Sequence, residues 1–489
     1  MPQRRPNILW IMTDQQRYDA LGANGNPHIR TPNLDRLAAE SANLSNCFVQ
    51  APVCVPSRQT FFTGRYPHCH RNRVNYTPLA QSETLIQARL RDAGYTTGFV
   101  GKLHYYPPTR EHALSTGFDH GLLHDAAQCD GHSDYVRWLT ERDPAMARQY
   151  RRTRTDSANP YRTILPDALH ETTWCGQQTR DMLTQFAGQD RPFFLFSSYW
   201  KPHPSFELPD PWASMYDDVE IPLPDPVTLE QIHTLPLPVQ KMVLRGDSRV
   251  YQTPPDRMQW MYRAYYGAVT QIDHEVGLTL DLLSQLNLER ETVVIFCSDH
   301  GDQMFEHGMR GKNVFYEGSV HVPLLIRWPD VVRPARHTDL VESTDVLPTL
   351  FDCCCLDTPP GNQGQSFASR ITGDSVGSPY RPRDYVFAEN VIPEVITEGN
   401  LNHFYQPGQG VNDIVHPDAK MIRDRRWKYC YYVDHGHELY DFETDPHETI
   451  NRADDPACRD RVQGMRAALL DWLITADERD QIAPRWRDV

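Results

Sequence analysis

The fold is decided by the stretch Asn7-Ile8-Leu9-Trp10-Ile11-Met12-Thr13, an apolar run that ends at the polar pair Asp14-Gln15. A short continuous run of this kind is typical of a strand that is buried on both faces of a parallel sheet. Four further runs have the same character, at residues 96–100, 192–199, 292–298 and 322–328. Helical patterns lie between them, so an α/β fold is predicted, with a mixed or parallel central sheet covered by helices.

The first predicted helix has Thr31 as its N-terminal cap and Pro32 at its first position, and its apolar positions extend to Leu44. Further helices are predicted at residues 85–93, 170–187, 256–287 and 345–355.

Two changes of composition interrupt this pattern. Residues 201–260 contain eleven of the 39 prolines, which indicates a long ordered excursion whose expected role is to wall a pocket. Gly, Ser and Pro gather near residues 373–382 and predict a boundary between an α/β domain at 1–375 and a smaller C-terminal α+β subdomain at 376–489. The subdomain is expected to hold antiparallel strands within 419–432 and 438–442 and a closing amphipathic helix at 459–476.

The composition limits the partners of the chain. Its 489 residues carry a formal net charge of −15, which opposes attraction to nucleic acid or an anionic membrane, so an anionic ligand would need a local positive pocket. No run approaches the ~20 apolar residues of a membrane span. Eleven cysteines without C-x-x-C spacing indicate neither a disulfide framework nor a zinc site, and a cytoplasmic location is predicted. Long aromatic loops are compatible with a homo-oligomer.

Two polar clusters follow predicted strands. Asp14 and Gln15 come after the first strand, and Asp299 and His300 come after the strand at 292–298. One such carboxylate often only caps a turn, but two strand ends that are rich in oxygen ligands favour a divalent cation at the carboxyl edge of the sheet. Oxygen donors with one imidazole suit calcium, magnesium or manganese.

The most specific motif is Cys54-Val55-Pro56-Ser57-Arg58, followed by Thr63-Gly64-Arg65. On residue chemistry alone, Cys54 is either a nucleophile whose pKa is lowered by Arg58 or a buried inert thiol. The motif resembles the signature of the type I sulfatases of the alkaline phosphatase superfamily, in which this cysteine is oxidised to formylglycine. Further landmarks stand in the family's order, and together they cover nearly the whole chain: Gly101-Lys102-Leu103-His104, Lys201-Pro202-His203, Ser298-Asp299-His300-Gly301, Gly311-Lys312 and Leu439-Tyr440-Asp441.

The resemblance implies an alkaline phosphatase-like α/β core, a formylglycine-generating maturation enzyme as partner, and one divalent ion. Calcium is the expected ion, with manganese and magnesium as alternatives. The implied metal ligands are Asp14, Gln15, modified Cys54, Asp299 and His300. The pair Asp14-Gln15 replaces two consecutive aspartates and is similar to the choline sulfatase and phosphonate monoester hydrolase branch.

The resemblance also implies the roles of the remaining site residues. Arg58 would hold the formylglycine region, and His104 would assist the elimination that re-forms the aldehyde. Lys102 and Lys312 match lysines that grip sulfate oxygens, and His203 matches a histidine beside the leaving group. Asn75 resembles an asparagine that binds the transferred group.

The function that these features predict is hydrolysis of a small sulfate monoester through a covalent sulfo-enzyme intermediate. The alternative is hydrolysis of phosphonate or phosphate mono- or diesters at the same site, although Lys102 and His104 favour the sulfatase. A non-catalytic protein with a vestigial site is a third possibility, but it predicts a broken motif, which the sequence does not have. Specificity is expected from the proline-rich excursion and a loop at 390–410.

Overall fold

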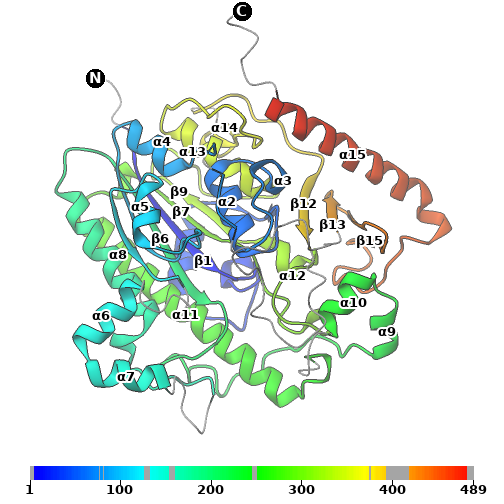
Figure 1. Cartoon of the computed structure of the whole chain (residues 1–489), viewed down its shortest axis with the longest axis horizontal. Coiled ribbons are helices and arrows are strands. Elements are labelled where there is room, and N and C mark those ends of the chain that lie inside the picture. The colour runs from blue at the N-terminus through cyan, green and yellow to red at the C-terminus, as the bar shows by residue number, and fades with distance from the viewer. Residues whose placement is uncertain are drawn as a thin grey trace, which may run out of the picture.

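The computed structural model describes residues 5–75, 77–80, 82–125, 133–152, 160–244, 250–373, 376–391 and 418–481. Its centre is an eight-stranded sheet with the strand order β10-β2-β9-β7-β1-β6-β4-β5 (Figure 1). The strands are β1 (Asn7–Asp14), β2 (Ala42–Leu44), β4 (Thr96–Gly101), β5 (His120–Leu123), β6 (Phe193–Pro202), β7 (Thr292–Ser298), β9 (Leu324–Arg327) and β10 (Ala335–His337). Because β1 is parallel to β6 and β7 while β9 is antiparallel to β7, the predicted mixed sheet is confirmed.

Helices cover both faces of this sheet. The helices of the α/β part include α1 (Pro32–Ala39), α2 (Cys54–Thr63), α3 (Pro67–His70), α4 (Ile86–Asp92), α5 (Arg110–Ser115), α6 (Asp134–Arg142), α7 (Pro144–Arg152), α8 (Glu171–Ala187), α11 (Pro255–Gln285), α12 (Glu317–Val320), α13 (Val346–Cys353) and α14 (Ala368–Thr372). Alternate residues of β1 face opposite layers: Leu9 and Ile11 join the core formed with α1, α8 and α11, whereas Trp10 joins the core formed with α2, α4 and α13. Both sides of β1 are therefore buried, which explains its continuous apolar sequence.

Two sequence-based details are wrong. The run at 322–328 is not one strand: β8 (His321–Val322) pairs with β3 (Cys47–Phe48) in a small sheet that also contains β11 (Val341–Glu342), and β9 begins after Pro323. Proline has no N–H to donate to a ladder, so it separates the two strands. Leu44 lies in β2 and not on α1, because the chain leaves the helix after Ala39.

A four-stranded antiparallel sheet forms the C-terminal part, with the order β12 (Val386–Val391), β13 (Asp418–Arg423), β14 (Trp427–Tyr432) and β15 (Gly436–Asp441). The closing helix α15 (Arg459–Gln481) packs Met465 and Trp472 against one face of this sheet. From the other face, Met421 and Tyr432 join the core of the large sheet. The strands and the closing helix are confirmed, whereas the domain boundary at residues 375 and 376 stays a prediction.

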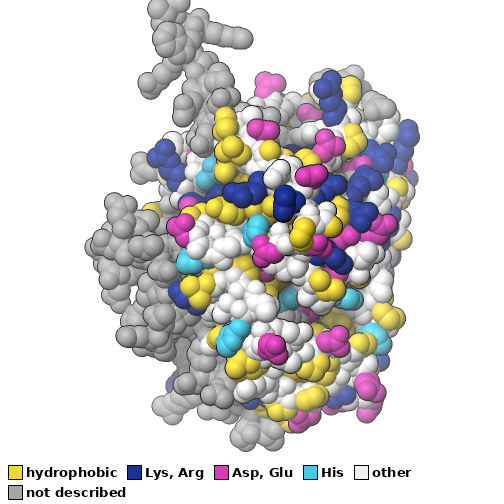
Figure 2. Space-filling model, turned by 90° about the vertical axis from the view of Figure 1, so that its right-hand side faces the viewer, with side chains coloured by type: hydrophobic (Ala, Val, Ile, Leu, Met, Phe, Trp, Pro, Cys, Tyr) yellow, Lys and Arg dark blue, Asp and Glu magenta, His cyan; other side chains and the backbone are white. Residues whose placement is uncertain are grey.

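The proline-rich excursion contains the short helices α9 (Leu229–His233) and α10 (Leu237–Val243). No helix in the described part of the chain is long and apolar enough to cross a membrane. The ten cysteines found there are free thiols. On the face that Figure 2 shows, Lys and Arg side chains are interspersed with Asp and Glu. The cytoplasmic location stays a prediction, and residues 392–410 of the expected specificity loop lie outside the described residues.

Candidate active site

The candidate site lies at the carboxyl edge of the central sheet. Thr13 of β1 pairs with Ser298 of β7, so the residues that follow them, Asp14 and Asp299, are brought together although they lie far apart in the sequence. On the other side of β6 from β1, strand β4 ends at Gly101, directly before Lys102. The parallel strands thus bring both polar clusters to the carboxyl edge of the sheet, as predicted from their positions after strand ends.

Four buried side chains form a potential metal site. One ligand atom from each of Asp14, Cys54, Asp299 and His300 lies within 4.8 Å of the others. Asp14 Oδ1 is buried and has no hydrogen-bond partner among the described residues. It lies 3.6 Å from His300 Nε2, which in turn lies 3.5 Å from Asp299 Oδ1. A buried orphan carboxylate oxygen is costly, so this oxygen- and nitrogen-bearing cluster fits a divalent cation.

Charged neighbours keep Asp14 ionised. Burial alone would raise the pKa of Asp14, but the positive charges around it hold that pKa well below its usual value. These charges come from Lys102, Lys312 and Arg58. The carboxylate therefore remains available as a ligand or ion-pair partner near neutral pH.

Cys54 is the first residue of α2 and is fully enclosed. Its Sγ lies 2.8 Å from Lys312 Nζ and 3.2 Å from His300 Nε2. The N–H of Val55 donates to Asn75 Oδ1 at 3.0 Å, so the predicted asparagine lies at the same helix start. Burial and the charge of Asp14 act to raise the pKa of the Cys54 thiol, but nearby cations outweigh them and hold it well below its usual value. The electropositive helix start, the Lys312 ammonium and the His300 ring thus face the side chain of residue 54.

Arg58 is one helical turn after Cys54 and is completely buried. Its Nε donates to Asp299 Oδ2 at 2.7 Å, and its Nη1 donates to the Lys102 carbonyl at 2.8 Å and to Ser198 Oγ at 2.9 Å. Its Nη2 is 3.8 Å from Asp14 Oδ2. Arg58 therefore links the ends of β1, β4 and β7 with Ser198 of β6, and its buried charge is compensated by two carboxylates.

Lys102 and His203 share an aromatic neighbour that the sequence analysis missed. The ammonium of Lys102 contacts Asp14 Oδ2 and lies 4.0 Å from the ring centroid of Trp200. The Trp200 and His203 rings are 4.7 Å apart, and His203 Nδ1 is 2.6 Å from the Pro204 carbonyl oxygen. Burial, together with Lys312 and Lys102, lowers the pKa of His203 to about 3. The imidazole is consequently neutral here, with Nδ1–H donating to the carbonyl and Nε2 as the acceptor.

His104 follows Lys102 by two residues and adopts a left-handed backbone, with φ 59°. Its N–H is held by both carboxylate oxygens of Asp125, at 3.0 and 2.9 Å. The turn after β4 thus fixes the backbone of His104 at the edge of the site. Asp125 was not predicted from the sequence, and neither was the short strand β5 that it follows.

Gln15 lies beside the cluster. Its backbone N–H donates to Asp299 Oδ1 at 3.0 Å, and its side-chain oxygen accepts from Lys312 Nζ at 2.8 Å. Its side-chain nitrogen donates to Asp302 Oδ2. Lys312 therefore bridges Gln15 and Cys54. Asp302 was also missed, although it follows Asp299 by three residues.

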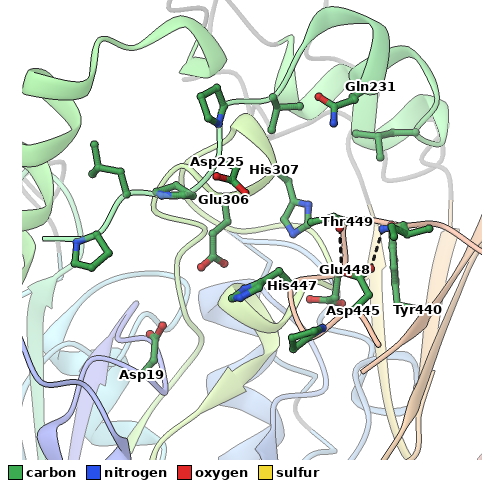
Figure 3. A pocket seen from close by; sticks show the side chains of 18 of the residues that line it. Asp19, Asp225, Gln231, Glu306, His307, Tyr440, Asp445, His447, Glu448 and Thr449 are labelled. Carbon is green, nitrogen blue, oxygen red and sulfur yellow. Dashed lines mark hydrogen bonds between the residues drawn. The ribbon is translucent and has the colours of Figure 1, made fainter. Parts of the chain in front are cut away.

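A cavity of about 810 Å³ lies apart from this cluster, where the proline-rich excursion faces the C-terminal part. Pro222, Tyr262 and Asp445 are among its lining residues, and Figure 3 shows Asp225 and Gln231 across the cavity from Asp445. The excursion does wall a pocket, as expected, but this lining includes none of the predicted catalytic residues. Its acidic side chains are largely paired within the protein, for example Glu306 with Arg17.

The chain belongs to the sulfatase family. Residues 6–354 match the family model described as Sulfatase, and residues 305–474 match that described as N-sulphoglucosamine sulphohydrolase, C-terminal. The chain is 29% identical to an arylsulfatase of Clostridium perfringens, covering 97% of this chain and 95% of that one. It is 28% identical to a choline-sulfatase of Rhizobium meliloti, covering 99% and 91%.

The fold is also that of a solved phosphonate monoester hydrolase from Agrobacterium radiobacter. The TM-score is 0.83 at 25% sequence identity, and the match covers 96% of each chain. The resemblance to the sulfatases, the alkaline phosphatase-like fold and the prediction of an enzyme of the sulfatase class are thus confirmed. The roles of individual residues stay predictions.

Proposed function

We propose that the protein hydrolyses a sulfate monoester, with residue 54 matured from cysteine to formylglycine and carrying the sulfate as a covalent intermediate. The observation that carries this proposal is the position of the Cys54 side chain. It stands at the start of a buried helix, 2.8 Å from the Lys312 ammonium and next to His300 within the acidic cluster. A formylglycine-generating enzyme is the partner that this maturation requires.

We further propose that a divalent ion, with calcium as the expected ion, is held by Asp14, Gln15, residue 54, Asp299 and His300. The orphaned Oδ1 of Asp14 supports this ligand set, since an ion would satisfy an otherwise unpaired buried oxygen. When bound, the ion supplies Lewis-acid stabilisation and lowers the pKa of a hydroxyl on residue 54. Arg58 fixes Asp299 in place through its Nε at 2.7 Å.

Cationic and neutral donors around residue 54 suit a tetrahedral anion. Lys312 and Lys102 would neutralise the oxygens of the transferred group, and Asn75 lies at the adjacent helix start. His203, with a free Nε2 in its neutral form, would carry the proton to the leaving oxygen once the bound anion raises its pKa, and Lys312 would share this role. His104 would accept a proton during the later elimination.

Phosphonate ester hydrolysis is the second candidate, because the solved hydrolase of that class shares the fold at a TM-score of 0.83. The test is the ratio of kcat/KM for p-nitrophenyl sulfate and p-nitrophenyl phenylphosphonate, measured on one preparation of matured enzyme. We expect the sulfate to be preferred, and Cys54→Ala to abolish turnover of both esters. A strong preference for the phosphonate would replace the first proposal by the second.

A further inference from the structure

The Gln15 side chain is held between two groups of opposite hydrogen-bonding type. Its Nε2 donates to the Asp302 carboxylate, and its Oε1 accepts from the Lys312 ammonium at 2.8 Å. A carboxylate can only accept and an ammonium can only donate, so the two neighbours fix which end of the amide faces which way. The oxygen end faces the side on which Lys312 also contacts Cys54, 2.8 Å away.

Asp302 is itself immobilised. Its side chain is buried, with 1% of the residue exposed, and Oδ1 accepts the backbone N–H groups of Met304 at 2.7 Å and Gly311 at 2.9 Å. Its carbonyl accepts from Arg17 Nη1 at 2.9 Å. Gly311 directly precedes Lys312, and the N–H of Gln303 donates to the Gly311 carbonyl at 2.7 Å. One carboxylate therefore closes the base of the loop at 303–311 and holds the Gln15 amide.

We propose that Asp302 is a positioning residue: it turns the oxygen of Gln15 toward the cluster and fixes the base of the loop that presents Lys312. This inference rests on the proposed function, because it assigns the Gln15 oxygen to the cation and Lys312 to the substrate anion. Hydrogen-bonding partners behind a metal ligand commonly set its orientation and strengthen the site. Asp302 does so here for an amide, whose two ends would otherwise be exchangeable.

The first test is Asp302→Asn. The new amide can keep its oxygen on the N–H groups of Met304 and Gly311, which leaves its NH₂ facing the NH₂ of Gln15. Gln15 must then turn its oxygen away from Lys312. We expect calcium affinity, measured by calorimetric titration of the full chain, to fall about 10- to 100-fold. Asp217→Asn is the control, because Asp217 is exposed, and this variant should bind calcium with the affinity of the wild-type chain.

The second test separates orientation from charge. Gln15→Glu supplies a carboxylate that can accept from the new amide at position 302, so it should restore binding in the Asp302→Asn background. In the wild-type chain the same change places the new carboxylate at position 15 directly against the carboxylate of Asp302. We expect Gln15→Glu to raise calcium affinity at least about tenfold more in the Asp302→Asn variant than in the wild-type chain. A difference of this size is within the range measured for two residues in direct contact. Equal effects in both backgrounds would show that charge alone matters and would overturn the inference.

The outcomes also distinguish this inference from the proposed function. If the wild-type chain binds neither calcium nor manganese, the proposed cation site is wrong, and this inference is wrong with it. If the wild-type chain binds calcium and the Asp302→Asn variant binds it equally well, only the positioning role is wrong. Circular dichroism of each variant reports folding, and failure of a folded double variant to bind would contradict the inference.

Discussion

At the scale of single residues, the site holds several charged side chains that are completely buried, which is unfavourable unless the charges are paired. Arg58, Asp14 and Asp299 have no exposed side-chain surface, and the positive charge of Arg58 stabilises both carboxylates. Burial alone would lower the pKa of Lys312, yet Cys54, Asp14 and Asp299 raise it above its usual value. The result is a cationic lysine beside an acidic cluster, which can hold an anion and a divalent ion together.

His203 provides a prediction that depends on the leaving group. If His203 protonates the departing oxygen, His203→Ala should lower kcat/KM about 100-fold or more for an alkyl sulfate, whose alkoxide leaves poorly. For p-nitrophenyl sulfate, whose nitrophenolate needs little protonation, the loss should be below about tenfold. Steady-state kinetics with both esters test this. Equal losses for the two substrates would mean that His203 only binds the sulfate.

Sequence reasoning reaches the residues that mark strand ends and motifs, but not those that support them. Asp14, Asp299 and His300 follow apolar runs, and Cys54 lies in a specific motif, so all four could be identified. Trp200 could not, because it extends the β6 run and looks like core, although its ring lies 4.0 Å from Lys102 Nζ. Asp302 becomes meaningful only when folding brings Gln15 beside it.

At the scale of elements, the end of β4 depends on a glycine. Gly101 has φ +94°, and a Cβ there would lie 2.0 Å from the Ser198 carbonyl oxygen of β6. Gly101→Ala should therefore reduce the free energy of unfolding by about 2–4 kcal/mol, as backbone strain adds to a clash that cannot relax. Urea unfolding measures the loss.

Gly25→Ala is the matched control for this variant. Gly25 has a similar φ of +101°, but a Cβ there meets nothing within 4 Å. Gly25→Ala should therefore lower the free energy of unfolding by the backbone strain alone, about 1–2 kcal/mol. Equal losses for the two variants would show that the contact with β6 is unimportant.

The short helix α3 is tied to β12 by an ion pair that depends on pH. His68 Nδ1 lies 2.7 Å from Glu389 Oε1, and the ring also packs against Trp472 of α15. Burial alone would lower the pKa of His68, but hydrogen bonds with Cys69 and Glu389 and the charge of Glu389 raise it to about 9. The folded protein thus binds this proton more tightly than the unfolded chain, in which the pKa is about 6.5.

It follows that the stabilisation by His68 is complete below pH 6.5 and is lost as the pH rises to about 9, with a total of about 3 kcal/mol. His68→Gln removes the titrating group. The difference in unfolding free energy between the unmodified protein and His68→Gln should shrink across this window. Urea unfolding at pH 6 and pH 9.5 measures it, and a constant difference would refute the ion-pair assignment.

Elements with a long, regular pattern were predictable, whereas their interruptions were not. The predicted helix at 256–287 matches α11 within two residues at each end, and the strand at 292–298 matches β7. The run at 322–328 gave no sign that its two halves would pair in different sheets, because strand pairing is set by distant residues such as those of β3 and β7. The apolar pattern of a strand predicts that it is buried, but it does not predict which strand it pairs with.

At the scale of the whole molecule, the net charge of −15 coexists with a site built around positive side chains. Lys102 and Lys312, together with the proposed divalent ion, would supply the local positive charge that an anionic ligand requires. The family matches reach from residue 6 to residue 474, so they include both the carboxyl edge of the central sheet and the C-terminal sheet. That sheet also shares its core with the large sheet.

The central claim is that residue 54, matured to formylglycine, carries out sulfate ester hydrolysis. The most direct measurement is the mass of the peptide that contains Cys54, taken from protein that was produced with a formylglycine-generating enzyme and hydrolyses p-nitrophenyl sulfate. The expected result is a peptide lighter than the thiol form by the difference between cysteine and formylglycine, in an amount that follows the activity of each preparation. Fully active protein containing only the unmodified thiol would contradict the claim.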